Sequence, residues 1–300
     1  MTERMDLSVV IPSVNGLPIV LECLNALRAD AASGVAIEML VVDRCGEDVR
    51  RALRDRFPEA TIVPTARDAT IPEMRALAFR HARADAIAVI EDHVLVPSGW
   101  ARQMLEALAA GHDVVGGIVL NAATERLVDW AAFLCEYSHL LPPIPAGEAE
   151  WLTGNNVVYR KAVLEKYQAT LAEGRWEDYL HAAMRRGGVA LFCRPDIVVG
   201  HKMHYRVRDY LSQRYLYARG CAGQQRTAMS TAARAVKAVG TLTLPPVLLF
   251  RIVSRVLASS SHRAELARSM PLLGVFVCAW AFGEMVGYVA GPGDTMGRIS

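Results

Sequence analysis

The sequence predicts an α/β fold in which a mainly parallel sheet is flanked by helices, followed by C-terminal helices at a membrane. Short apolar runs alternate with amphipathic stretches over the first 120 residues. The mean hydropathy is +0.20, high for a soluble enzyme, and the excess lies in residues 241–290. Residues 201–300 carry 13 Lys and Arg against 4 Asp and Glu, whereas the other 200 residues carry 20 against 27. This asymmetry indicates an acidic body and a basic tail that meets an anionic partner.

Five continuous apolar runs are predicted as strands, at residues 7–13, 37–43, 61–65, 86–92 and 113–120. Runs of this kind are typical of strands covered by helices on both faces. Strands that alternate with helices favour right-handed crossovers, and these place the strands parallel in one sheet.

Four stretches between these runs carry apolar residues at helical spacing, namely residues 18–29, 47–57, 72–83 and 98–110. Pro72 suits a first helical turn, and Ser98 is the predicted N-cap of its helix. Further helices are predicted at residues 124–140, 177–187 and 203–237.

Polar residues follow the predicted strands where an open α/β sheet binds its ligands. The ends of the predicted strands carry Pro12, Ser13 and Asn15 at the first, Asp43 at the second, and Glu91, Asp92 and His93 at the fourth. No GxGxxG sequence and no Walker A sequence follows the first strand. Dinucleotide-dependent dehydrogenase and P-loop interpretations therefore lose their main support.

Each of the polar groups has a functional and a structural interpretation. The acids at 91 and 92 suit Mg²⁺ or Mn²⁺ with substrate phosphates, but they also suit a solvated turn. Glu177 and Asp178 open a predicted helix, where they either offset the helix dipole or supply a general base. His201 follows an apolar strand, and a lone histidine there is most often an ordinary residue.

The C-terminal third is predicted to contact a membrane. Residues 203–237 mix arginines and tyrosines, as an interfacial helix does, although a solvated helix is the alternative. Residues 270–290 are long enough to span a bilayer. Residues 241–258 are interrupted by two prolines, Arg251 and Arg255, which favours an interfacial or re-entrant segment before one span. A two-helix hairpin is the alternative.

Several segments together resemble family 2 glycosyltransferases of the GT-A fold, over roughly residues 7–205. LSVVIPSVNG resembles the opening strand and nucleotide-contacting loop, and VVDRCGED the second strand with its base-contacting acids. AIAVIEDHVLVPSGW resembles the metal-binding DxD segment, and GNNVVYRKAVLE the acceptor-side turn. EDYLHAAMRRGGVALFCRPDIVVGH follows the pattern of an acidic pair, helix, strand and terminal histidine.

The chain departs from the family pattern at two positions. Arg44 stands where a second acid is usual, and Ile90 stands where the first acid of the DxD motif is usual. These departures keep open a non-catalytic membrane-anchored interaction protein built on a degraded transferase fold. A sugar-phosphate nucleotidyltransferase is a further alternative, although the loop after the first strand has no Lys or Arg.

The resemblance implies an inverting, hexosyltransferase-type glycosyltransferase that uses a nucleotide-diphosphate sugar and a divalent cation, Mn²⁺ or Mg²⁺. It implies Asp178 as the general base with Glu177 beside it, and Asp92, His93 and His201 as metal ligands. The implied nucleotide-sugar contacts are Pro12, Ser13, Asn15, Asp43, Glu91, Asp92, Asn155 and Asn156.

The expected organisation is a transferase domain at residues 1–202, a basic interfacial helical region at 203–240 and a membrane-associated segment at 241–300. No apolar run follows the N-terminal charges, and the six cysteines form no CxxC pair. We therefore expect a catalytic domain on the cytoplasmic side of the cell membrane, with a lipid-linked hydroxyl as its acceptor. Nucleic acid is not an expected partner, because the basic tail runs into apolar segments.

Overall fold

The computed structural model describes residues 4–299, and its contacts divide the chain into two compact units. The first unit contains residues 1–120 and 144–202, and the second contains residues 121–143 and 203–300. The contacts thus group residues 121–143 with the C-terminal helices, which lie far away in the sequence. The predicted division at residues 202 and 240 stays a prediction.

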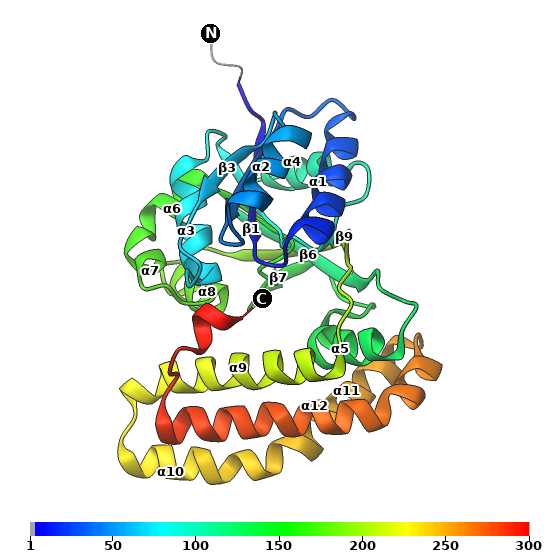
Figure 1. The fold of residues 1–300 in the computed structure, drawn as a ribbon, viewed down its shortest axis with the longest axis vertical. Helices are drawn as coiled ribbons and strands as arrows, with labels where there is room; N and C mark the ends of the chain where they lie inside the picture. Colours follow the sequence, from blue (N-terminus) through cyan, green and yellow to red (C-terminus); the bar gives the residue numbers. More distant parts are fainter. Residues whose placement is uncertain (1–3, 300) are drawn as a thin grey trace. The chain divides into compact units, whose positions relative to one another are not determined.

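A nine-stranded sheet forms the framework of the first unit, in the order β3-β2-β1-β4-β8-β6-β9-β5, with β7 paired to β9 (Figure 1). Strands β1, β2, β3 and β4 pair in parallel, whereas β8 pairs antiparallel with both β4 and β6. The predicted α/β fold with a flanked sheet is confirmed. The strands are β1 Leu7–Ser13, β2 Ile37–Asp43, β3 Thr61–Pro64, β4 Ala86–Val89, β5 Val94–Leu95, β6 Val114–Asn121, β7 Gly147–Ala149, β8 Val157–Arg160 and β9 Leu191–His201.

Helices cover both faces of this sheet, which explains the continuous apolar strands. Alternate residues of β1 and β2, such as Val10 and Leu40, join one core cluster with residues of α3, α6 and α8. Their neighbours, such as Val9 and Val41, are buried on the other face. The helices of this unit are α1 Leu17–Ala31, α2 Glu47–Arg56, α3 Ile71–His81, α4 Trp100–Ala109, α6 Lys161–Lys166, α7 Gln168–Ala172 and α8 Glu177–Arg186.

The start of α4 differs from the prediction, because Ser98 is not its N-cap. Gly99 occupies that position with a φ of 86°, a left-handed conformation that glycine adopts without strain. The buried carboxylate of Asp30 on α1 accepts the N–H groups of Gly99 at 2.6 Å and Ala101 at 2.8 Å. A side chain from another helix therefore satisfies the N-terminal amides that a local serine was expected to satisfy.

The second unit is helical, and α12 packs along α9 at close range (Figure 1). A Cβ atom added at Gly283 would lie 2.5 Å from the carbonyl oxygen of Tyr215, and one at Gly287 would lie 2.6 Å from that of Arg219. Glycine is required there because the two backbones approach so closely. The helices are α5 Leu127–Tyr137, η1 Ser138–Leu140, α9 Val207–Gln225, η2 Arg226–Ala228, α10 Thr231–Gly240, η3 Thr241–Thr243, α11 Leu244–Ser259, α12 Arg263–Ala290 and η4 Thr295–Arg298.

Two helices of this unit are long and apolar enough to cross a membrane, judged by length and composition alone. They are Thr231–Ser259, which runs through α10 and α11, and Arg263–Ala290, which is α12. Both contain the apolar segments that the sequence predicts, and both begin several residues before them.

Candidate functional site

The loop after β1 and the turn after β4 meet through the carboxylate of Asp92. Asp92 is fully buried and accepts the backbone N–H groups of Val14 at 2.8 Å and Asn15 at 2.9 Å. It also accepts the side-chain amide of Asn15 at 2.8 Å. Asp92 therefore fixes the loop that follows the first strand, and its oxygens are engaged by the protein itself.

His93 and His201 lie side by side because β5 pairs antiparallel with the end of β9, with Val94 opposite His201. Their Nε2 atoms are 2.9 Å apart. On its other side, His93 Nδ1 lies 3.0 Å from Asp92 Oδ1, so that Asp92 orients the imidazole ring. The predicted proximity of these two histidines is therefore present in the structure.

Glu91 completes a group that could hold a metal ion. Its Oε2 atom lies 3.3 Å from His93 Nε2, and the ligand atoms of Glu91, His93 and His201 all lie within 4.8 Å of one another. Two ligands on one ion at about 2.1 Å are separated by roughly 3.0–3.4 Å, and the separations of Glu91 and His201 from His93 Nε2, 3.3 Å and 2.9 Å, are close to this range. Glu91, which the resemblance assigns to the nucleotide sugar, thus lies beside the two histidines, and the assignment of Asp92 as a metal ligand stays a prediction.

The two histidines differ in protonation. Burial by itself lowers the pKa of His93, but hydrogen bonds with Asp92 and Glu91 outweigh burial and raise the pKa to about 10. Burial, followed by repulsion from His93, lowers the pKa of His201 to about 3. Burial by itself raises the pKa of Glu91, but the hydrogen bond to His93 together with attraction to His93, Arg75 and His201 outweighs burial and lowers it. His201 is therefore neutral at pH 7, the form in which histidine binds a metal, whereas His93 is protonated and would have to release a proton to bind one.

A buried cation, Arg75 on α3, connects this group to the start of α8. Its guanidinium lies 3.6 Å from Glu91 Oε1 and 2.8 Å from Glu177 Oε2. Arg75 is not among the site residues predicted from the sequence. Its spacing in the sequence could have indicated that it is buried, because Arg75 lies four residues after Ile71 and four before Phe79, on the apolar face of α3. A charged residue on such a face usually has a buried partner.

Glu177 and Asp178 begin α8 and have different surroundings. Glu177 packs against Gly154, where an added Cβ atom would lie 2.4 Å from the Glu177 carboxyl carbon. Asp178 is exposed, and partial burial of its carboxyl together with repulsion from Glu177 raises its pKa. The structure thus brings Glu177 into the network of Arg75 and Glu91, and leaves Asp178 one residue away at the surface.

The two adjacent asparagines have opposite roles. Asn155 donates to Glu91 Oε2 at 3.1 Å and accepts from Thr153 Oγ1 at 2.6 Å, so it belongs to the site. Asn156 is fully buried and donates to the carbonyl oxygens of Ile118 and Ile197, while its own oxygen accepts from Trp100 Nε1. Asn156 therefore holds strands together, and its predicted contact with a nucleotide sugar has no support in this geometry.

The ends of β1 and β2 place Ser13 and Asp43 opposite each other, as expected of parallel neighbours. Ser13 Oγ donates to Asp43 Oδ1 at 3.0 Å, and Gly46 N donates to Asp43 Oδ2 at 3.1 Å. Pro12, one residue earlier in β1, is buried with them. Arg44 donates to the carbonyl oxygen of Ala69 at 2.8 Å, so the residue that departs from the family pattern is built into the neighbouring loop.

An α/β sheet with acids, amides and histidines gathered at its strand ends defines the class, a GT-A-like transferase. The chain belongs to glycosyl transferase family 2, whose model matches residues 8–168. The protein is accordingly a glycosyltransferase, as the sequence predicted, and the nucleotidyltransferase alternative loses its support.

Solved structures of similar fold include a mannosyltransferase, PcManGT from Pyrobaculum calidifontis, in complex with GDP-Man and Mn²⁺. It is 16% identical, with a TM-score of 0.57 over 95% of this chain and 88% of that chain. S. aureus TarS 1-349 is 12% identical, with a TM-score of 0.49 over 94% of this chain and 91% of that chain. No curated protein matches the sequence. The first likeness supports the GT-A-like fold.

Proposed function

We propose that the protein transfers a hexose, with inversion, from a nucleotide-diphosphate sugar to a hydroxyl acceptor at the cytoplasmic face of a membrane. The observation that carries this proposal is the network from His201 and His93 through Glu91 and Arg75 to Glu177. It joins a group suited to a cation with the acidic start of α8, and transfer of a sugar from a diphosphate needs both.

The donor lies at the strand ends in this proposal, against Pro12, Ser13, Asn15, Asp43 and Asn155. A divalent cation held by Glu91, His93 and His201 would offset the charge that develops on the diphosphate leaving group. Two imidazoles and one carboxylate suit Mn²⁺ better than Mg²⁺, which prefers oxygen ligands. The mannosyltransferase of similar fold, in complex with GDP-Man and Mn²⁺, supports this choice of donor and cation.

Asp178 acts as the general base. The acceptor oxygen attacks the anomeric carbon as the bond to the diphosphate breaks, and Asp178 takes the hydroxyl proton. A single displacement of this kind inverts the anomeric configuration. The raised pKa of Asp178 makes it a stronger proton acceptor, whereas the Glu177 carboxylate is held in an ion pair with Arg75.

The acceptor is presented at a membrane, and a lipid-linked hydroxyl is the kind of acceptor that this location favours. Support comes from the two long apolar helices of the second unit. The membrane assignment is independent of the reaction chemistry, so either can fail without the other.

A donor screen with Asp178→Asn and Glu177→Gln tests the reaction. We expect the purified full-length protein to release one nucleoside diphosphate, and Asp178→Asn to lower turnover by about 10²–10⁴-fold. Nuclear magnetic resonance of the product should show the inverted anomer. Retention of configuration, or near-normal turnover in Asp178→Asn, would contradict the proposal. Absence of transfer from every donor would favour the non-catalytic interaction protein.

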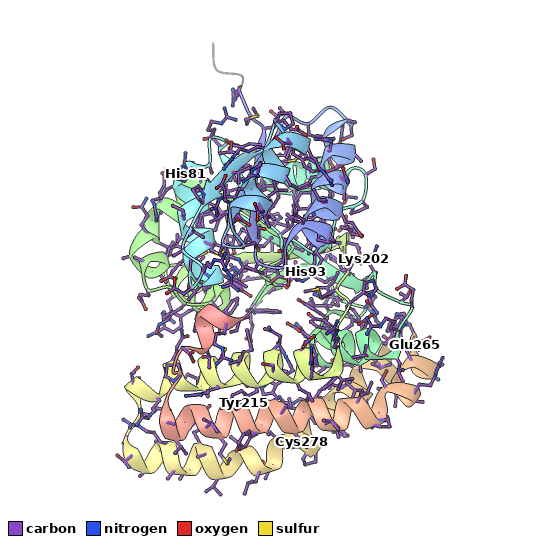
Figure 2. The ribbon with its side chains drawn as sticks, in the orientation of Figure 1. His81, His93, Lys202, Tyr215, Glu265 and Cys278 are labelled. Carbon is purple, nitrogen blue, oxygen red and sulfur yellow. The ribbon has the colours of Figure 1, made fainter. Side chains whose placement is uncertain are left out.

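Calorimetric titration with Mn²⁺ tests the cation site without requiring activity. We expect His201→Gln to weaken Mn²⁺ binding by about 10–100-fold, the loss typical when a group supporting or ligating a metal is changed. His81→Gln is the matched control, because His81 is an exposed histidine at the end of α3 and lies outside this group (Figure 2). Equal Mn²⁺ affinity in the two variants would rule the site out.

A further inference from the structure

α12 does not stand alone in the second unit, because α9 follows it over most of its apolar length. The rings of Tyr210 and Phe276 are 4.5 Å apart, and those of Tyr215 and Phe282 are 5.7 Å apart. Further along, Tyr288 donates to the side-chain oxygen of Gln225. Figure 2 labels Tyr215 on α9 and Cys278 on α12. If α12 enters a membrane, α9 therefore lies at the same depth as α12.

α9 is a polar helix that suits the surface of a bilayer and not its centre. Arg214 lies near its middle and is surrounded by the rings of Tyr210, Tyr217 and Trp280, with an ion pair to Glu136 at 3.4 Å. Arg219, one and a half turns later, donates to the carbonyl oxygen of Gly291 at 3.1 Å. If α12 crossed the membrane, Arg214 beside Trp280 would lie at hydrocarbon depth, where charged side chains are costly, whereas Arg219 reaches the end of α12.

The helix through α10 and α11 presents three different faces. Ala238, Ile252 and Val256 are buried against the unit. Val239, Phe250 and Leu257 are exposed, Phe250 by 73%, and are separated by 11 and 7 residues, close to whole numbers of helical turns.

Three cations form the remaining face: Lys237, Arg251 and Arg255 are exposed and are separated by 14 and 4 residues. These positions lie along the helix and not only at its ends. A helix with exposed apolar residues along one side and cations along another is the pattern of a helix that lies in the plane of a membrane surface.

α12 also exposes an apolar stripe. Val275, Phe282 and Val289 recur every seven residues and are at least half exposed, while Phe276, Gly283 and Gly287 on other sides of the helix are buried. Some apolar residues of α12 therefore pack within the unit, and others lie on its outer surface.

From these observations we propose that the second unit is monotopic: α10, α11 and α12 lie along the surface of an anionic phospholipid bilayer, and neither long apolar helix crosses it. The apolar stripes contact the acyl chains, and Lys237, Arg251 and Arg255 contact the headgroup phosphates. This inference rests on the proposed membrane association and is independent of the proposed transfer reaction.

Epitope tags on the full chain, expressed in cells, test the topology. One tag is placed at the N-terminus, one in the turn at Ser261 between α11 and α12, and one after Ser300. We expect the chain in the membrane fraction and all three tags on the same side, accessible to protease in inside-out vesicles and protected in intact cells. A C-terminal tag alone on the opposite side would mean one span, and a Ser261 tag alone on the opposite side would mean a hairpin. Either result would overturn the in-plane arrangement while leaving membrane association intact, whereas a wholly soluble chain would overturn both.

Flotation with vesicles tests the lipid chemistry. The full chain is compared on phosphatidylcholine vesicles with and without phosphatidylglycerol, at low salt. Each cation near an anionic surface changes binding by about fivefold, so the triple variant Lys237→Gln, Arg251→Gln, Arg255→Gln should reduce the preference for phosphatidylglycerol on the order of 100-fold.

The matched control removes three exposed cations of α2, as Arg51→Gln, Arg54→Gln, Arg56→Gln, and should keep the preference. If the preference for phosphatidylglycerol falls less than tenfold in the variant of Lys237, Arg251 and Arg255, or falls equally in both triple variants, the assigned headgroup contacts are wrong.

Discussion

At the level of single side chains, two carboxylates depend on the buried cation Arg75. Its guanidinium lies between Glu91 and Glu177, and its side chain is almost wholly buried. A buried ion pair contributes little net stability, but removing one partner leaves a charge that neither water nor a counter-ion compensates. Arg75 therefore positions the site, since it determines where both carboxylates lie.

Substitution of Arg75 tests this dependence. We expect Arg75→Met to lower the free energy of unfolding by about 3 kcal/mol, because it leaves Glu91 and Glu177 without their buried counter-charge. Adding Glu177→Gln to Arg75→Met should recover about 1 kcal/mol of this loss, and chemical denaturation of the four proteins of the cycle measures it. If the double variant is no more stable than Arg75→Met, the two residues do not interact as described.

Adjacent residues also show how far the site could be predicted from the sequence. The acidic segment before His93 was recognised as a metal-binding candidate, and so was His201. The sequence could not show how Glu91 and Asp92 are oriented. Asp92 accepts hydrogen bonds from the backbone amides of the loop between β1 and α1, and these fix its side chain. Those amides lie 77 and 78 residues earlier in the chain, beyond any local pattern.

At the level of helices and strands, periodicity predicted most elements of the first unit to within a few residues. Strands β1 and β2 have the predicted bounds, and α2 ends one residue before the predicted end. The differences arise where a distant side chain intervenes, as Asp30 does at the start of α4. The second unit was less predictable, because the packing of α5 against α12 joins segments more than 100 residues apart.

Glu38 on β2 links three elements, and its pKa gives a pH dependence. It accepts hydrogen bonds from Ser8 Oγ at 2.5 Å and from the backbone N–H of Arg83 at 2.8 Å, and its other oxygen accepts from the Arg83 side chain. Burial alone would raise the pKa of Glu38, but these bonds outweigh burial and lower it. A lowered pKa means that the stabilisation is present above the unfolded-state pKa, and is lost as pH falls through the lower folded-state pKa.

We therefore expect Glu38→Gln to destabilise the protein by about 2 kcal/mol at pH 7, the usual range for a buried charge-assisted hydrogen bond. The difference between wild type and variant should shrink as the pH falls below about 4.5, near the unfolded-state pKa of glutamate. Thermal melting of both proteins from pH 7 to pH 3 measures this. A difference that is independent of pH would mean that Glu38 is not ionised in the folded protein.

At the level of the whole molecule, the second unit combines a segment from the middle of the chain, residues 121–143, with the C-terminal helices. α12 packs on α9 and on α5, so part of the apolar surface of these two helices is buried by α12. The near-neutral net charge of +2 conceals a chain whose last hundred residues are strongly basic. Its composition is best described for each part of the chain, and not for the whole.

Truncation tests this mutual dependence. We expect a chain that ends at residue 237 to aggregate, because deletion of α11, α12 and the end of α10 uncovers residues of α9 such as Tyr210, whose ring lies 4.5 Å from that of Phe276. Size-exclusion chromatography with light scattering compares it with the full-length protein in the same detergent. A monodisperse truncated protein would show that the remaining helices of the second unit are stable without α12.

The place of α5 in the chain has a consequence for biosynthesis. α5 ends at Tyr137 and its packing partner α12 begins at Arg263, which is 126 residues later. At a translation rate of roughly 5–20 residues per second, a ribosome needs roughly 6–25 s to cover that interval. During this time the first unit can acquire its strands one after another, whereas α5 is made before α9, which hydrogen-bonds to it through Tyr210, and long before α12. The nascent chain is therefore most vulnerable at a helix near its middle, and a chaperone that shields α5 co-translationally would protect the molecule until its last helix is made.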